Sequence, residues 1–229
     1  MRTIGLLGGM SWESTVVYYQ RLNRGVRERL GGLHSASLVL WQVDFAQVER
    51  LQASGRWDEA GALLAQGGRA LQAAGAGLVG LATNTMHAVC GPLEAALSVP
   101  FVHLVDVTAR AAREAGVRRL GLLGTDYTMS SPYFVQRYAA SGVEVLVPEP
   151  ESRALVHRVI YEELCRGVVD AGSRAQVLRQ VEALQARGAQ AVALGCTELG
   201  LLLSPADASL PLLDTTALHC EALLDAALG

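Results

Sequence analysis

The chain has 229 residues, 51% of them hydrophobic, which is enough to bury a core in one large domain or in two of roughly 100 residues. All 19 lysine-or-arginine positions are arginine, and the absence of lysine excludes pyridoxal phosphate enzymes, P-loop proteins and Schiff-base aldolases, which all need a lysine amine. The net charge of −3 argues against a nucleic-acid surface, and no apolar run reaches the roughly 18 residues of a membrane helix.

The first half of the chain predicts alternating strands and helices. Apolar runs predict strands at 3–7, 37–43 and 77–82. Amphipathic patterns predict helices at 12–30 and 58–74. Ser11 or Ser14 is the expected N-cap of the first helix, and Gly75 ends the second. The strand at 77–82 opens into a polar loop, Thr83-Asn84-Thr85.

The second half repeats this pattern. Strands are predicted at 120–123, 143–147 and 191–194. A helix is predicted at 173–187, ended by Gly188, and the strand after it opens into Gly195-Cys196-Thr197-Glu198.

The two halves also resemble each other in amino-acid sequence. GLLGGMSWES from Gly5 matches GLLGTDYTMS from Gly121, and LATNT from Leu81 matches LGCTE from Leu194 at nearly the same spacing. Matching order, spacing and loop type indicate an internal duplication. The predicted fold is therefore α/β, with two similar doubly wound parallel-sheet domains and an active-site cleft between them. We assign 1–105 plus 211–229 to the first domain and 106–210 to the second.

The duplication puts Thr83 and Cys196 in equivalent positions. Ligands of doubly wound sheets bind at the carboxyl ends of the strands, so both residues are expected at the ligand site. One proton-carrying group on each wall of a cleft suits inversion at a carbon, because one group removes a proton and the other delivers one to the opposite face.

The segments GLLGGMSWEST, ATNTMH, GLLGT and GCTE, taken together and in this order, resemble the aspartate/glutamate racemase family. The resemblance covers essentially the whole chain. It implies a cofactor-independent amino-acid racemase that acts without pyridoxal phosphate, as a cytoplasmic homodimer, on aspartate or glutamate. Relatives carry a cysteine on each wall, whereas this chain has Thr83 in place of the first. It thereby resembles a subgroup that prefers the L-enantiomers.

The threonine predicts a bias between enantiomers. We expect backbone N–H groups and a helix N-terminus to favour the thiolate of Cys196, whereas the Thr83 hydroxyl is a poor base at neutral pH. Proton abstraction by Cys196 from one enantiomer is then efficient, and the opposite enantiomer reacts slowly. Equal catalytic efficiency on D- and L-aspartate would contradict this interpretation.

The same loops supply the expected substrate-binding residues. These are Met10, Ser11, Gln42, Asn84, Thr85, Tyr127, Thr128, Thr197 and Glu198. Asn84 and Thr85 suit the α-carboxylate, although helix capping explains them as well. Glu198 suits the substrate ammonium, and Met10 on its own is typical of packing. Arg158 and Arg166 are both candidates for the distal carboxylate.

The remaining cysteines and histidines suggest no metal. Cys90, Cys165 and Cys220 are expected as small core residues, and no His/Cys spacing matches a zinc site. His87 is expected to cap or pack. Without a secretion signal, reduced thiols in a cytoplasm are expected.

Two other classes of function stay open. Hydantoin racemases, maleate isomerases and malonate decarboxylases are related families, and a single well-placed thiol suits a decarboxylase. The second class is a non-catalytic, two-lobed protein that binds an acidic metabolite. If a Cys196→Ala variant exchanged α-protons as the parent protein does, the binding protein would be favoured.

Overall fold

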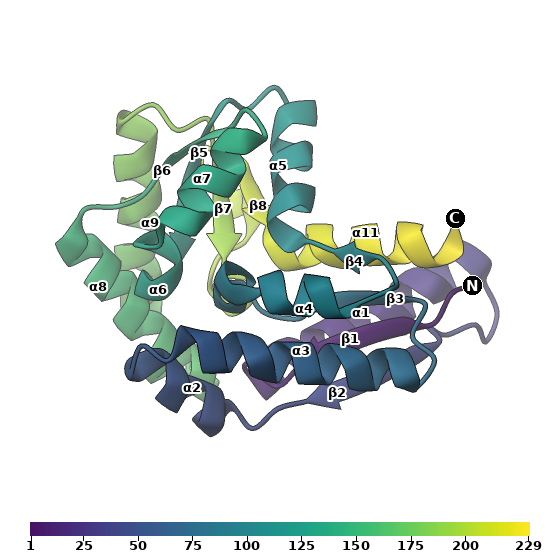
Figure 1. Ribbon diagram of the computed structural model, residues 1–229. Helices are drawn as coiled ribbons and strands as arrows, with labels where there is room; N and C mark the ends of the chain where they lie inside the picture. Colours follow the sequence, from purple (N-terminus) through teal and green to yellow (C-terminus); the bar gives the residue numbers. More distant parts are fainter. The chain divides into compact units, whose positions relative to one another are not determined.

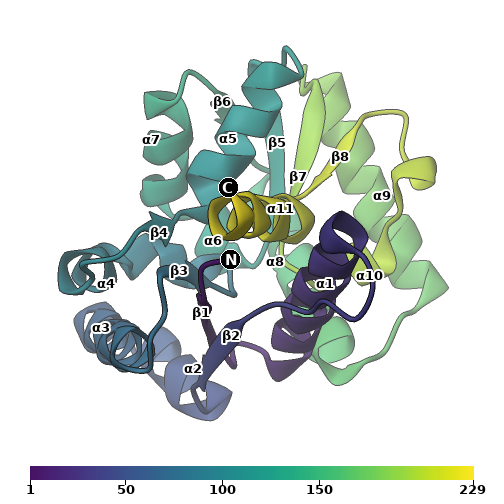
Figure 2. The same ribbon diagram turned by 90° about the vertical axis from the view of Figure 1, so that its right-hand side faces the viewer.

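The computed structural model describes all 229 residues and divides them into two compact units. The first unit combines Met1–Leu104 with His219–Gly229, and the second is Val105–Leu218. Each unit holds one four-stranded sheet whose pairings are all parallel (Figures 1 and 2). The predicted α/β class with two parallel sheets is therefore confirmed.

The first unit builds its sheet in the order β2-β1-β3-β4. Its strands are β1 (Ile4–Gly8), β2 (Leu38–Gln42), β3 (Leu78–Leu81) and β4 (Phe101–Val102). Its helices are α1 (Trp12–Leu30), α2 (Phe45–Ala53), α3 (Trp57–Ala73), α4 (Gly91–Ala96) and the greater part of α11 (Thr215–Leu228). A 3-10 turn, η1 (Thr85–Val89), follows β3.

Apolar side chains cover both faces of this first sheet. Tyr18 of α1 and Leu223 of α11 pack with Leu6 on one face. On the other face, Leu64 of α3 packs with Leu7. Figure 2 shows α1 and α3 on opposite sides of this sheet. Burial of a side chain of this size contributes roughly 1.5–3 kcal/mol, so these layers hold the strand ends in fixed positions.

The second unit repeats the arrangement in the order β6-β5-β7-β8. Its strands are β5 (Arg119–Gly124), β6 (Glu144–Leu146), β7 (Ala191–Gly195) and β8 (Leu212–Asp214). Its helices are α5 (Leu104–Glu114), α6 (Asp126–Met129), α7 (Pro132–Ala140), α8 (Pro150–Arg158), α9 (Ala171–Ala186) and α10 (Leu199–Leu202). Shorter helical segments are η2 (Val159–Glu163), η3 (Leu164–Arg166) and η4 (Pro205–Asp207). Val156, Val177 and Leu194 belong to its largest apolar cluster.

The two sheets have equivalent strand orders, as a duplication predicts. β1 and β3 pair at the centre of the first sheet, and β5 and β7 take the same places in the second. One detail differs from the domain boundaries predicted above. β8 pairs with β7, so residues 212–214 lie in the second sheet, although 211–229 was assigned to the first domain. The division into two folding domains itself stays a prediction.

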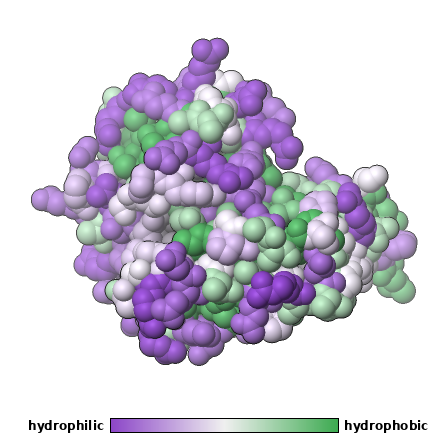
Figure 3. Space-filling model, viewed as in Figure 1, coloured by the Kyte–Doolittle hydropathy of each residue, from purple (hydrophilic) through white to green (hydrophobic).

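The surface drawn in Figure 3 carries hydrophilic side chains over much of α2, and polar and weakly apolar side chains alternate along α3. This pattern fits the helices, because Asp58, Gln66 and Arg69 of α3 face outward while Leu64 and Leu71 are buried. No helix is both long enough and apolar enough to cross a bilayer.

Candidate active site

The turn between β1 and α1 is held by a glycine and a hydroxyl. Gly9 has a φ of 93°, and a Cβ there would lie 2.3 Å from the Val43 carbonyl oxygen, so only glycine fits. Its N–H donates to Thr15 Oγ1 at 2.8 Å. Ser11 is the N-cap of α1 and accepts from the Ser14 N–H at 3.2 Å. Met10 and Ser11 are thus fixed, and both buried, at the carboxyl end of β1.

The loop after β3 is anchored by a histidine. His87 Nδ1 donates to the Thr83 carbonyl oxygen at 2.7 Å, and His87 Nε2 accepts from the Leu104 N–H at 3.3 Å. Burial, with the nearby His103 and His219, lowers the pKa of His87 well below its usual range. The imidazole is therefore neutral and carries its proton on Nδ1, which confirms a packing and anchoring role.

The parallel register gathers the predicted residues of the first unit at one edge of the sheet. Gly8 pairs with Gln42 and Leu7 pairs with Leu81, so β1, β2 and β3 end together. Gln42 is exposed as the last residue of β2, whereas Thr83, Asn84 and Thr85 are buried after β3. Asn84 precedes η1 without a side-chain cap bond, so capping does not explain that side chain. The first candidate half-site is therefore made of Met10, Ser11, Gln42, Thr83, Asn84 and Thr85.

The loop after β7 carries a thiol beside a carboxylate. Cys196 is partly exposed, and its thiol donates to Glu198 Oε2 at 2.9 Å. The other carboxylate oxygen, Oε1, accepts from the Cys165 thiol at 3.9 Å. Loss of hydration and the Glu198 charge raise the pKa of the Cys196 thiol well above its usual range.

This electrostatic environment corrects one prediction. We expected a helix N-terminus to favour the thiolate, but α10 has only four residues and Glu198 is its N-cap residue. The adjacent carboxylate outweighs the Glu198 backbone N–H, which is the smaller influence on the pKa of Cys196. Cys196 is therefore a thiol that is hydrogen-bonded to Glu198.

The predicted threonines of the second unit are engaged in the fold. Thr197 Oγ1 lies 3.0 Å from Thr216 Oγ1, and Thr128 Oγ1 lies 3.2 Å from that of Thr125, the N-cap of α6. Thr128 is fully buried. Tyr127 is partly exposed and packs edge-on against His157, with 5.6 Å between the ring centroids. Thr128 and Thr197 therefore hold the loops, and Tyr127 is the more accessible side chain.

Cys165 is the residue that sequence reasoning placed differently. It was expected as a small core residue, and it does pack against the main apolar cluster of its unit, but it is partly exposed and its sulfur reaches Glu198. No local pattern pointed to it, since it lies on η3, far from Cys196 in the sequence. The candidate arginines Arg158 and Arg166 are both exposed and form no ion pair.

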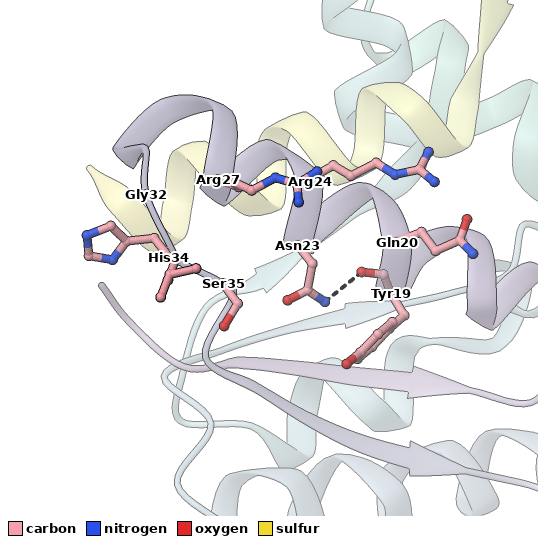
Figure 4. Close-up of a pocket in the computed structure, with 9 residues that line it drawn as sticks. Tyr19, Gln20, Asn23, Arg24, Arg27, Gly32, His34 and Ser35 are labelled. Carbon is pink, nitrogen blue, oxygen red and sulfur yellow. Dashed lines mark hydrogen bonds between the residues drawn. The ribbon is translucent and has the colours of Figure 1, made fainter.

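A separate hollow in the first unit lies between α1 and the segment after it. It has a volume of about 400 Å³ and is lined by Tyr19, Gln20, Asn23, Arg24, Arg27, Gly32, Leu33, His34 and Ser35 (Figure 4). Asn23 donates to the Tyr19 carbonyl oxygen and accepts from the Ala36 N–H, so it joins the helix to that segment. None of the strand ends contributes to this hollow, so it is not part of the candidate active site.

The family follows from a comparison over nearly the whole chain. The family profile for Asp/Glu/Hydantoin racemase matches residues 7–223, which include all the candidate site residues of both units. The chain belongs to this family. The resemblance noted from the sequence is confirmed at this level, and membership points to isomerase chemistry on a small molecule.

Solved structures agree with this assignment. A candidate Asp/Glu racemase from Yersinia pestis is 45% identical over 100% of both chains, with a TM-score of 0.93. An aspartate racemase homologue from Pyrococcus horikoshii OT3 is 31% identical over 100% of both chains, with a TM-score of 0.87. Among curated proteins, the broad specificity amino-acid racemase RacX of Bacillus subtilis is 22% identical over 70% of this chain and 69% of its own.

Proposed function

We propose that this protein racemises an acidic amino acid, aspartate or glutamate, without pyridoxal phosphate. The observation that carries the proposal is the thiol of Cys196, hydrogen-bonded to Glu198 at the carboxyl end of β7. Thr83 occupies the equivalent end of β3, and the two half-sites act on opposite faces of one Cα. Family membership supports this chemistry, and aspartate or glutamate appears in the names of two related structures.

The proposed reaction begins with the thiol proton. Glu198 accepts it from Cys196, and the thiolate then removes the proton at Cα of the L-amino acid. The Thr83 hydroxyl, relayed by water, donates a proton to the opposite face of the carbanion. Glu198 releases the original thiol proton to water, water returns a proton to the Thr83 oxygen, and Cys196 keeps the proton taken from Cα. One proton has then left Cα and one has been added to it, and the three side chains are back in their starting protonation states.

The proposed substrate contacts use the groups at the same strand ends. Asn84 and Thr85 bind the α-carboxylate with side chains and N–H groups, and Glu198 accepts a hydrogen bond from the substrate ammonium. Gln42, Met10, Ser11 and Tyr127 supply the remaining substrate contacts, and Thr128 and Thr197 hold the loops that carry Tyr127 and Cys196. Arg158 or Arg166, neither of which is paired, binds the distal carboxylate.

Isotope exchange tests the proposal directly. The protein is incubated in D₂O with the L- and D-forms of aspartate and of glutamate, and loss of the Cα proton is followed by NMR. We expect exchange with an L-form to be the fastest, and Cys196→Ala to abolish it. Cys220→Ser, a change at a buried cysteine on α11, is the matched control and should exchange normally. Equal exchange by Cys196→Ala and the parent protein would contradict the proposal and favour a binding protein.

One other reaction is compatible with a single cysteine at the candidate site. A malonate-type decarboxylase needs one cysteine to protonate one face of the carbanion, and only one half-site carries a cysteine. An arylmalonate decarboxylase variant shares the fold, with a TM-score of 0.58, but at 16% identity this shows the fold alone. Release of CO₂ from an α-substituted malonate, without α-proton exchange on amino acids, would favour this alternative.

A further inference from the structure

A cysteine, a glutamate and a histidine of the first unit converge beside the segment that follows the candidate half-site. Cys90 Sγ, a carboxylate oxygen of Glu94 and a ring nitrogen of His103 all lie within 4.8 Å of one another. None of the three belongs to the proposed proton-transfer machinery. Thiolate, imidazole and carboxylate together are a zinc ligand set, whereas Mg²⁺ and Ca²⁺ prefer oxygen ligands alone.

Local structure explains why these three meet. Cys90 and Glu94 are one helical turn apart, with the Glu94 N–H donating to the Cys90 carbonyl oxygen at 2.9 Å, so their side chains share a face. His103 follows β4, which pairs with β3 and brings the histidine next to the η1–α4 segment. Zinc-ligand spacings in the sequence do not reveal this set, because its third ligand comes from the next strand.

The three ligand atoms are close to the spacing of a metal site, and one of the three side chains is exposed. Zinc bonds of about 2.0–2.3 Å place tetrahedral ligand atoms about 3.5 Å apart, so the 4.8 Å span has to contract by about 1.3 Å. Cys90 and His103 are buried, whereas Glu94 is exposed, so a change of its rotamer can supply the contraction. A thiolate and a carboxylate also balance the charge of a divalent cation.

From this convergence we propose that Cys90, Glu94 and His103 bind one Zn²⁺ ion, with water as the fourth ligand. The ion ties the start of α4 to the end of β4. His103 packs edge-on against His87, with 4.6 Å between ring centroids, and His87 anchors the Thr83 carbonyl. A metal here therefore stabilises the segment that follows Thr83, and this proposal does not depend on the racemase reaction.

Cobalt substitution tests the site through the thiolate ligand. The full-length protein is treated with EDTA, dialysed and titrated with Co²⁺, which gives a sulfur-to-metal charge-transfer band in the near ultraviolet when a thiolate binds. We expect one equivalent to saturate this band, and one equivalent of Zn²⁺ to displace it. Cys90→Ser should lose the band, and Cys220→Ser, at a second buried cysteine of the same unit, should keep it.

Further variants separate this site from metal binding elsewhere on the protein. Glu94→Gln alters an exposed side chain and should weaken Co²⁺ binding at least ten-fold without unfolding the protein, whereas Glu49→Gln, an exposed change on α2, should not. A protein with both Cys165→Ser and Cys196→Ser should keep the band. Absence of saturable binding, a band that survives Cys90→Ser, or unchanged affinity in Glu94→Gln would overturn the proposal.

Discussion

At the scale of single residues, the difference between Thr83 and Cys196 is the chemical feature that sets the expected stereochemistry. Thr83 follows β3, which pairs with β1, and Cys196 follows β7, which pairs with β5. Thr83 carries a hydroxyl, whereas Cys196 carries a thiol. A hydroxyl is a far weaker acid than a thiol, so almost none of it is ionised near neutral pH. The neutral hydroxyl that remains is a poor base. Rates on the two enantiomers should therefore differ, although the equilibrium constant between them cannot.

A second thiol should remove this bias. We expect Thr83→Cys to raise Cα proton exchange on the disfavoured D-substrate by about 100-fold, the lower range for a positioned acid or base. Thr83→Ser keeps a hydroxyl and is the matched control, for which no gain is expected. Exchange measured in D₂O with D-aspartate and D-glutamate decides the matter. If Thr83→Cys exchanged the D-form no faster than Thr83→Ser, Thr83 would not be the source of the bias.

The Cys196–Glu198 pair predicts a pH effect. Loss of hydration and the Glu198 charge both raise the pKa of the thiol, so removing the charge should lower that pKa. Alkylation by iodoacetamide requires the thiolate, so its rate rises with pH through the thiol pKa. In Glu198→Gln, the midpoint for Cys196 should move to lower pH, as followed by residue-resolved mass spectrometry. Glu162→Gln, an exposed change on η2, should leave the midpoint in place; a midpoint that stays unchanged in Glu198→Gln would refute the pairing.

At the scale of elements, buried histidines join the parts of the first unit. His219 Nδ1 accepts from the Tyr18 hydroxyl at 2.8 Å, and His219 Nε2 donates to the Val102 carbonyl oxygen at 2.8 Å. The ring therefore links α11 to α1 and β4 in its neutral form. Burial lowers the pKa of His219 from 6.5 to about 4.

This network should weaken in acid. Between pH 6.5 and about 4 the unfolded chain binds a proton at His219 that the folded protein does not, so the free energy of unfolding falls as pH decreases. The lowered pKa corresponds to about 3 kcal/mol lost by pH 4. Urea denaturation of His219→Gln should show a smaller decrease over this range than the parent protein, whereas exposed His34→Gln should behave as the parent. An identical decrease in His219→Gln would rule out this contribution.

At the scale of the whole molecule, α1 presents apolar side chains to solvent. Trp12, Val16 and Tyr19 are 60%, 41% and 53% exposed, and their spacing places them on one helical face. A monomer rarely exposes such a face without use, and the family resemblance implies a homodimer. We therefore propose that this face contacts a second copy of the chain.

Sedimentation measures this association. The parent protein should sediment as a dimer, and Trp12→Glu combined with Tyr19→Glu should sediment as a monomer, because charged side chains would be buried at the contact. Val135→Glu, at an exposed apolar residue of α7, is the control and should remain dimeric. A dimer that persists in the double variant would exclude this face.

Much of this architecture could be predicted from the sequence alone. Hydrophobic periodicity predicted α1 at its observed bounds of Trp12–Leu30, and the repeated LATNT and LGCTE letters predicted equivalent strands β3 and β7. These predictions succeed because each helix or strand must bury an apolar face, and the spacing of apolar residues along the sequence reveals that face. The order of the loop motifs was likewise sufficient to indicate the racemase family whose profile matches residues 7–223.

Tertiary structure decided what depends on distance between segments. Only the fold brings the Cys165 thiol to the Glu198 carboxylate, and burial of Cys196 beside that carboxylate reverses the expected direction of its thiol pKa. Only the pairing of β4 with β3 brings His103 to Cys90 and Glu94. Residue type and the periodicity of apolar residues are properties of the sequence. Electrostatic interactions and metal coordination depend on the distances between side chains, and packing sets those distances.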